Sequence, residues 1–270
     1  MPDSLRFAHI QVQTASWCNR TCAFCPSGTF EIPKTFMEEA VYRRIVDELA
    51  RLSFAGRFSP YLMNEPLLDK RLPDLIALAR DALPNASIFI SSNGDALSLA
   101  LGGQLFDAGL DCLLVNLYDL ETPVRQRSER IVAELARERD LPILNQPSFP
   151  DLIGGTLIRN GPQIALVDAA DWKVEQLTNR AGNVPGAAVQ AEPLAASCYR
   201  PFEQAYIRYN GEVVLCCCDW KGEVVFGDVT TTPLDEIFAG PVASRYRDQL
   251  GRNSRHGLKL CETCDFHGVL

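Results

Sequence analysis

The chain has 270 residues, of which 47% are hydrophobic and 22% are charged, values typical of a globular protein. Its 26 basic and 34 acidic side chains give a net charge of −8, which disfavours nucleic acid as a partner because such a chain gains little from displacing phosphate counterions. No apolar run approaches the ~20 residues that span a bilayer, and residues 1–13 lack the apolar core of a secretory signal. We therefore expect a cytoplasmic protein with no membrane partner.

Residues 9–168 alternate strand-like runs with amphipathic helical runs. The patterns predict strands over residues 9–16, 57–63, 87–92, 112–118, 141–146 and 163–168. They predict helices over residues 36–52, 72–83, 97–108 and 122–139. This alternation is typical of parallel βαβ units, so we expect an α/β fold in which six strands form a partial barrel or an open parallel sheet.

The pattern changes after about residue 170. Residues 205–217 predict a β-hairpin that turns at Asn210-Gly211, and a short strand over 223–229 and one helix over 233–250 follow. A loop containing glycine and proline, residues 179–188, lies between the two patterns. We predict two domains, residues 1–175 and residues 176–270.

The cysteines form two groups, one at each end of the chain. There are ten, and only Cys112, which we expect in the core, lies between residues 26 and 197. In a reducing compartment, clustered thiols indicate metal binding or catalysis before disulfides. The distribution predicts two metal sites.

The first group is Cys18-x3-Cys22-x2-Cys25, directly after the first predicted strand. Three thiolates can hold three irons of a cubane cluster and leave the fourth iron open to an exchangeable ligand. Zinc, bound by these thiols and a distant fourth ligand, is the alternative. The group resembles the CxxxCxΦC motif of radical S-adenosylmethionine (SAM) enzymes, in which Φ is aromatic, and Phe24 takes that place.

Three later segments match this resemblance at successive strand ends, where parallel α/β folds bind their ligands. The family usually places Gly-Gly-Glu after the second strand to hold the methionine amino group, and here only Glu65-Pro66 is retained after Asn64. The Ser-Ser-Asn-Gly segment at 91–94 is alternatively an ordinary turn. The cofactor-binding residues that the resemblance implies are Phe24, Asn64, Glu65, Ser91, Ser92, Asn93, Asn116 and Tyr118.

The second group is Cys198-x12-Gly211-x4-Cys216 followed by Cys261-x2-Cys264. Four cysteines can ligate one further cubane, and a four-cysteine zinc site is the alternative. The spacing resembles the twitch domain, a shortened SPASM extension that carries one auxiliary [4Fe–4S] cluster. The resemblance thus implies a partial (β/α)6 barrel, similar to a TIM barrel, with a small C-terminal α+β twitch domain.

Cys216 is followed directly by Cys217 and Cys218, and the Gly-x4-Cys count selects Cys216 as the ligand. Each of the other two is either an inert buried thiol or a donor of a hydrogen atom to a substrate radical.

The two-cluster layout resembles the short radical SAM dehydrogenases of aminoglycoside antibiotic biosynthesis. The resemblance implies cleavage of SAM to a 5′-deoxyadenosyl radical, removal of hydrogen from a secondary alcohol of a cyclitol, aminocyclitol or sugar, and transfer of the second electron to the auxiliary cluster. It implies a flavodoxin- or ferredoxin-type reductant.

The resemblance also places Arg180 where the family has an arginine that assists loss of the hydroxyl proton; pairing with Glu175 is the alternative. Tyr61 and Cys217 are further catalytic candidates, with core packing the alternative for Tyr61.

Three other functions remain open at this stage. A radical epimerase would quench the substrate radical with Cys217 or Cys218. A peptide-modifying enzyme would commonly carry a further recognition domain or a longer SPASM tail, so a small substrate fits this chain better. A zinc or iron–sulfur protein without enzymatic activity would not bind SAM.

Overall fold

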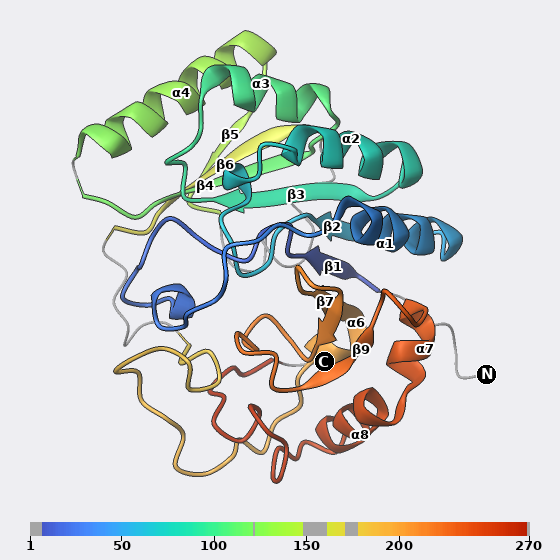
Figure 1. Ribbon diagram of the computed structural model, residues 1–270. Helices are drawn as coiled ribbons and strands as arrows, with labels where there is room; N and C mark the ends of the chain where they lie inside the picture. The colour runs from blue at the N-terminus through green and yellow to red at the C-terminus, as the bar shows by residue number, and fades with distance from the viewer. Residues whose placement is uncertain (1–6, 121, 148–160, 171–177, 269–270) are drawn as a thin grey trace.

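The computed structural model describes residues 7–120, 122–147, 161–170 and 178–268. Within them one nine-stranded sheet runs through the molecule in the order β5-β6-β4-β3-β2-β1-β7-β8-β9 (Figure 1). The strands are β1 (His9–Val12), β2 (Arg57–Ser59), β3 (Ser87–Ser92), β4 (Cys112–Leu117), β5 (Ile143–Asn145), β6 (Gln163–Asp168), β7 (Gln204–Ile207), β8 (Glu212–Val214) and β9 (Val225–Asp228).

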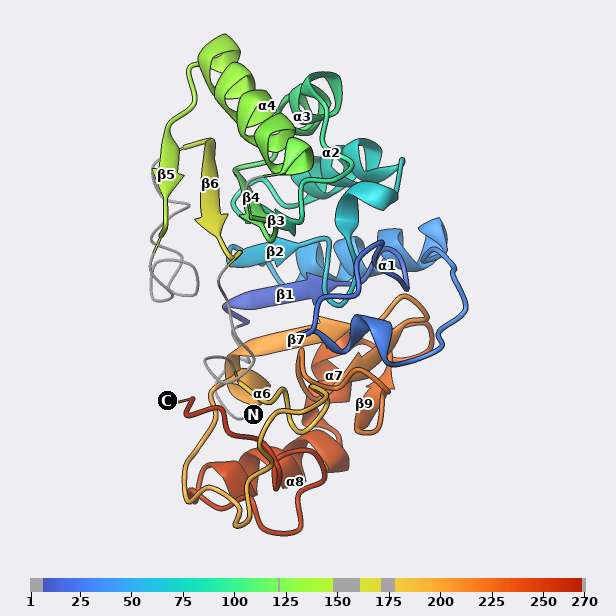
Figure 2. The same ribbon diagram turned by 90° about the vertical axis from the view of Figure 1, so that its left-hand side faces the viewer.

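The strands from β1 to β6 form the parallel α/β layer that the sequence predicts. Every pairing among them is parallel, and β6 lies between β4 and β5 at the far edge. Four helices lie along one side of this layer, as Figure 2 shows. They are α1 (Glu39–Arg51), α2 (Leu72–Ala82), α3 (Leu99–Asp107) and α4 (Pro123–Arg139).

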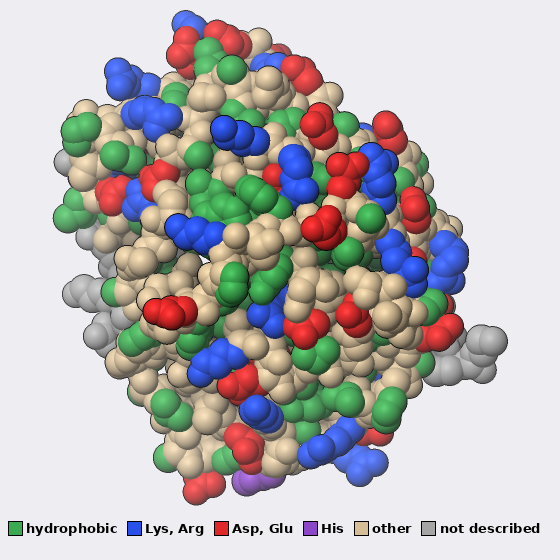
Figure 3. Space-filling view, in the orientation of Figure 1, with side chains coloured by type: hydrophobic (Ala, Val, Ile, Leu, Met, Phe, Trp, Pro, Cys, Tyr) green, Lys and Arg blue, Asp and Glu red, His purple; other side chains and the backbone are tan. Residues whose placement is uncertain are grey.

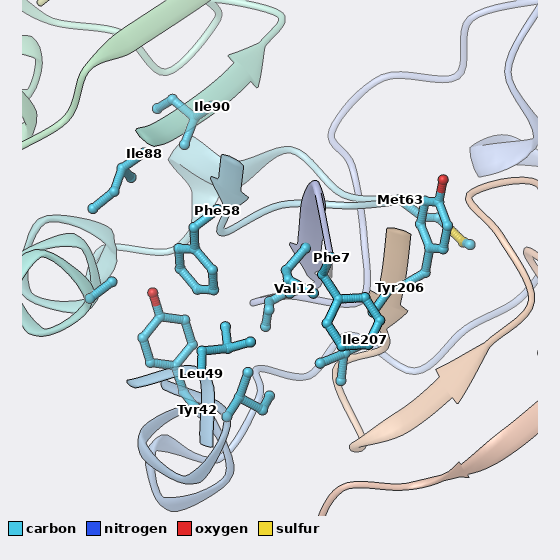
Figure 4. Packing of buried hydrophobic residues seen from close by; sticks show 14 of the residues in the cluster. Phe7, Val12, Tyr42, Leu49, Phe58, Met63, Ile88, Ile90, Tyr206 and Ile207 are labelled. Atoms are coloured by element: carbon cyan, nitrogen blue, oxygen red, sulfur yellow. The ribbon is translucent and has the colours of Figure 1, made fainter. Parts of the chain in front are cut away.

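Helix α1 shows how a helix is held to the sheet. Its buried residues Tyr42, Ile45, Val46 and Leu49 recur at helical spacing, so they form one apolar stripe. The Tyr42 ring packs edge-on against Phe58 of β2, with 6.0 Å between centroids (Figure 4). The Tyr42 hydroxyl donates to the carbonyl of Leu75 in α2, so a buried polar group is satisfied and two helices are joined.

Several of the predicted strands are shorter than expected, including those over 141–146 and 223–229, and two others matter for the site. The strand predicted over 57–63 ends at Ser59, because Pro60 has no N–H to donate to a neighbouring strand. The strand predicted over 9–16 ends at Val12. Residues 13–38 and 60–66 consequently form long connections at the carboxyl ends of β1 and β2, and these connections carry the first cysteines and Glu65.

The C-terminal part continues the same sheet. Strand β7 lies parallel to β1, with His9 opposite Gln204 and Val12 opposite Ile207, and the predicted hairpin is formed by antiparallel β7 and β8. Gly211 turns the hairpin at a φ of +91°, where a Cβ would also lie 2.9 Å from the Asp228 carboxylate. The predicted boundary between residues 175 and 176 lies outside the described residues and stays a prediction.

The prediction of a single helix over residues 233–250 is wrong. The segment forms two helices, α7 (Leu234–Ala239) and α8 (Pro241–Leu250). Gly240 between them has an extended backbone with ψ of 163°. Pro241 explains the break, since proline disfavours a helical residue before it and supplies no N–H to a preceding turn.

An aromatic cluster ties the two halves of the chain together. Phe238 of α7 is fully buried, and its ring meets Phe7, just before β1, at 4.7 Å and Phe226 of β9 at 5.7 Å. On the outer surface, acidic and basic side chains are interspersed over the face that Figure 3 shows. In the described part of the chain, no helix combines the length and apolar character needed to cross a membrane.

We expect Phe238→Ala to lower the free energy of unfolding by about 3–5 kcal/mol, because it leaves a cavity among aromatic rings from both halves. Denaturant unfolding under anaerobic conditions measures the change. Val242→Ala on α8, where the side chain is 40% exposed, is the matched control and should change stability little. Equal effects of the two substitutions would contradict this role for Phe238.

Candidate active site

One cavity of about 210 Å³ lies at the carboxyl ends of the central parallel strands, and we call it the main cavity. All eight predicted cofactor-binding residues line it, together with Tyr61 and Arg180. Residues up to 202 positions apart, from Cys18 to Trp220, thus surround one space. The predicted residues on its wall are Cys18, Cys22, Phe24, Cys25, Tyr61, Asn64, Glu65, Ser91, Ser92, Asn93, Asn116, Tyr118 and Arg180.

The three cysteines after β1 open into this cavity. No fourth cysteine and no histidine is among its described lining residues, so the protein offers three thiols there. Burial raises the pKa of Cys18 to about 11 and raises that of Cys22. Since iron binds thiolates, loading a cluster must displace these protons.

Glu65 joins the end of β2 to the end of β3. Its buried carboxylate accepts from the Ser92 hydroxyl at 2.7 Å and from the Asn93 backbone N–H at 2.8 Å. It also accepts from the N–H of Leu67, capping the short 3-10 helix Pro66–Leu68. Burial raises the pKa of Glu65 to about 7, so a cation bound beside it would favour the ionised form.

Two buried donors on the cavity wall have no hydrogen-bond partner among the described residues. They are Nδ2 of Asn64, whose Oδ1 accepts from the Leu62 N–H, and Nε1 of Trp220. Buried donors are nearly always paired, so these two are available to a ligand. Trp220 was not among the predicted site residues. The one feature of the sequence that could have indicated it is its position four residues after Cys216.

Arg20 fixes the loop between the first two cysteines. Its guanidinium donates to both Asp95 oxygens, at 2.5 and 2.7 Å, and to both Asp119 oxygens, at 2.6 and 3.1 Å. The two carboxylates raise the pKa of Arg20, and the guanidinium lowers the pKa of Asp119. The cysteine loop is thereby held to the ends of β3 and β4 by paired charges. No sequence pattern singled out Arg20, although it is a cation inside the cysteine motif.

The remaining predicted residues of the main cavity form local contacts. Asn116 on β4 donates to the Ser91 hydroxyl at 2.8 Å, and the Phe24 ring lies 5.4 Å from that of Tyr118. Tyr61 packs near Phe89 and also lines the cavity, and its catalytic role stays a prediction. Burial raises the pKa of Tyr61 to about 12, which keeps its hydroxyl protonated at neutral pH.

Arg180 reaches the main cavity from a tightly anchored loop. Arg180, Ala181 and Gly182 all have positive φ, and the preceding Asn179 is buried. The Asn179 backbone N–H donates to the Asp265 carboxylate, and its side chain donates to the Thr263 carbonyl. The loop is therefore fixed to the Cys261–Cys264 segment. Glu175, the alternative partner of Arg180, lies outside the described residues.

A second, smaller cavity is lined by Cys198, Cys216, Cys261 and Cys264, and we call it the four-cysteine cavity. Neither Cys217 nor Cys218 is among its lining residues, which favours Cys216 as the fourth ligand. No three His, Cys, Asp or Glu side chains in the described residues are arranged to hold a single metal ion.

Neither Cys217 nor Cys218 is among the residues that line the main cavity or the four-cysteine cavity. Cys218 is buried and accepts from the Arg200 guanidinium at 3.3 Å. A hydrogen bond with Cys218 and burial raise the pKa of Cys217, so its thiol stays protonated. The role of Cys217 as a hydrogen-atom donor stays a prediction.

Comparisons with known proteins bear on both cavities. Residues 198–265 match the SPASM model, described as an iron–sulfur cluster-binding domain. The chain has the fold of a radical SAM enzyme with a C-terminal SPASM domain. A crystal structure of BtrN in complex with AdoMet and 2-DOIA covers 97% of this chain and 94% of its own, with a TM-score of 0.77 and 24% identity. AdoMet-bound anSMEcpe covers 90% of this chain and 83% of its own, with a TM-score of 0.59 and 11% identity.

A curated relative is similar over nearly the whole chain. The S-adenosyl-L-methionine-dependent 2-deoxy-scyllo-inosamine dehydrogenase of Niallia circulans is 26% identical over 263 residues, which cover 96% of this chain and 93% of the relative. The predicted resemblance and the predicted fold class are confirmed. The SPASM match also confirms an auxiliary iron–sulfur site at the second cysteine group.

We expect Glu65→Gln to weaken SAM binding roughly ten- to a hundredfold, because a hydrogen bond to a charged group contributes ~1.5–3 kcal/mol. As pH rises through about 7, wild-type Glu65 loses its proton and holds an ammonium group better, whereas the amide does not change. The ratio of wild-type to variant affinity should therefore increase with pH. Anaerobic equilibrium dialysis at several pH values measures this ratio, in which the titration of SAM itself cancels.

The matched control is Glu39→Gln on α1, whose carboxylate is 53% exposed and pairs with Arg43. It should bind SAM like the wild type. A ratio for Glu65→Gln that stays flat across pH 7 would show that the Glu65 carboxylate does not contact the ligand.

Proposed function

We propose that this chain is a radical SAM dehydrogenase that oxidises a secondary alcohol of an aminocyclitol, cyclitol or sugar to a ketone. The observation that carries the proposal is the pair of cavities: one presents three thiols beside a polar pocket, and the other encloses four thiols. The first arrangement leaves one iron of a cubane open to SAM, and the second saturates its cluster. The similarity to the Niallia circulans dehydrogenase supports an aminocyclitol as the substrate class.

The residues of the main cavity fit SAM. The Glu65 carboxylate suits the ammonium group, and the unpaired Asn64 amide N–H suits the carboxylate or a ribose hydroxyl. Three thiols without a fourth suit a cluster that shares one iron with the methionyl group. The SAM-bound relatives BtrN and anSMEcpe support the same ligand.

The cofactors supply the one-electron chemistry. A cluster held by Cys18, Cys22 and Cys25 would supply the electron that cleaves SAM, and a cluster held by the four cysteines of the second cavity would accept the electron that the alcohol loses as it becomes a ketone. The protein must then hold the alcohol against SAM and help its hydroxyl proton to leave.

Arg180 is the residue for this second task. Its guanidinium lines the main cavity, on a loop fixed to the four-cysteine segment by Asn179. A guanidinium is a cation with N–H donors and no acceptor, so Arg180 stabilises the negative oxygen that remains when the hydroxyl proton leaves. Tyr61, protonated at neutral pH, serves as a donor to substrate oxygen rather than as a base. Trp220 supplies a further N–H to this end of the cavity.

The cavity geometry favours oxidation over epimerisation. An epimerase needs a thiol facing the substrate radical, and neither Cys217 nor Cys218 is among the residues that line the main cavity. Cys218 instead contacts Arg200 on the side of the four-cysteine cavity. A flavodoxin- or ferredoxin-type reductant for the first cluster stays a prediction.

Anaerobic assay with 2-deoxy-scyllo-inosamine and a panel of related cyclitols tests the proposal. We expect about eight irons per chain, and about four in a Cys18/Cys22/Cys25→Ala triple variant that no longer cleaves SAM. Each 5′-deoxyadenosine formed should accompany one ketone. If SAM is cleaved and the alcohol is inverted without formation of a ketone, the protein is an epimerase instead. If the wild type contains about four irons and one zinc, the chain has no auxiliary cluster to accept the electron, and the dehydrogenase proposal is wrong.

We expect Arg180→Gln to slow ketone formation roughly a hundredfold, the typical effect of removing one donor to a developing oxyanion. Iron content should stay unchanged, and SAM should still be cleaved. Arg180→Lys, which keeps the charge, should recover part of the rate. Arg130→Gln on the exposed face of α4 is the control. A normal rate in Arg180→Gln would assign proton loss to another group.

A further inference from the structure

The four-cysteine cavity has an unusual charge balance. Its described lining holds two arginines, Arg200 and Arg255, and no aspartate or glutamate. The remaining residues are the four cysteines and apolar side chains. Buried cations normally stand beside carboxylates, so two of them around a site for thiolates call for a physical reason.

Among the described residues, no acidic side chain pairs with Arg255, and backbone carbonyls hold it instead. The residue is 1% exposed, and its guanidinium donates to four backbone carbonyls at 2.7 to 3.1 Å, those of Ala196, Ser197, Cys264 and Phe266. These carbonyls belong to the two segments that carry Cys198 and Cys264. Carbonyl oxygens satisfy the N–H groups but carry no net charge, so the positive charge of Arg255 is not neutralised.

Arg200 is bound more loosely at the start of α6 (Arg200–Glu203). Its guanidinium lies 3.8 Å from the centre of the Phe266 ring and donates to the Cys218 thiol. No ion pair joins Arg200 to an acidic residue in the described part of the chain. The neighbouring Asp265 carboxylate accepts instead from the backbone of Asn179.

The charge of the site changes with its occupant. Four thiolates make a bound [4Fe–4S] cluster negative overall, and accepting one electron adds a further negative charge. In a buried site of low effective dielectric, a nearby cation stabilises the reduced form more than the oxidised form.

We propose that Arg200 and Arg255 are the charge-compensating residues of the auxiliary site and raise the reduction potential of its cluster. Arg255 also fixes the two ligand-bearing segments, whereas Arg200 acts mainly through its charge. Electron transfer from the deprotonated substrate radical, which becomes the ketone, to the oxidised cluster is thereby favoured. This inference rests on the proposed auxiliary cluster, and it explains why two cations remain unpaired beside it.

Arg200→Gln and Arg200→Lys test the proposal in the full chain carrying the Cys18/Cys22/Cys25→Ala background, so that only the auxiliary cluster gives a signal. An anaerobic redox titration followed by electron paramagnetic resonance measures its potential. We expect Arg200→Gln to make reduction at least tenfold less favourable, a downward shift of about 59 mV or more for a one-electron couple. Arg200→Lys should stay close to the parent, and so should Arg43→Gln on the exposed face of α1.

The outcomes separate the two hypotheses. If the parent contains no auxiliary cluster, the proposed function fails before the arginines are tested. If Arg200→Gln retains about four irons and titrates at the parent potential, the inference about Arg200 is wrong while the proposed function stands. For Arg255, we expect Arg255→Lys to lose much of the cluster, because one ammonium group cannot serve four carbonyls; full iron content in that variant would contradict its positioning role.

Discussion

The parallel pairing of β1 with β7 is the constraint on which the rest of the structure depends. Strand β1 leads into the loop of Cys18, and β7 leads through the hairpin to Cys216, four residues before Trp220. Because the two strands run in the same direction, the hairpin turn that follows β7 emerges at the same end of the sheet as the cysteine loop that follows β1, and antiparallel β8 then leads to Cys216. The C-terminal part also contributes Arg180 and Trp220 to a cavity built on the N-terminal strands. One continuous sheet positions both cysteine groups.

The two cysteine sites manage buried charge in opposite ways. At the first site, Arg20 forms ion pairs with two carboxylates. The guanidinium therefore holds the cysteine loop in place and adds no net positive charge. At the second site, Arg200 and Arg255 are matched by thiols and carbonyls. Under the proposed function, the main cavity binds the amino-acid part of SAM and the four-cysteine cavity receives an electron. These two tasks favour different local charge, and the lining residues differ accordingly.

Much of this could be predicted from local patterns. Strand and helix alternation indicated the parallel layer, and the cysteine spacings indicated two sites with three and four ligands. The polar residues at strand ends met in one cavity because parallel strands bring their carboxyl ends to one edge. The errors were also local in origin: Pro60 shortened a strand, and Gly240-Pro241 divided a helix, although both prolines are visible in the sequence.

The sequence by itself determined which residues are the candidates for the chemistry, because thiol ligands and Glu-Pro after a strand have recognisable spacing. Only the tertiary structure decided how charge and unpaired donors are distributed around them. Arg255 lies in no motif, and its four carbonyl partners come from segments up to 59 residues away. The N–H of Trp220 is likewise buried without a hydrogen-bond partner among the described residues, a property that depends on how the chain packs around it. Burial and pairing depend on long-range packing, which a one-dimensional pattern does not encode.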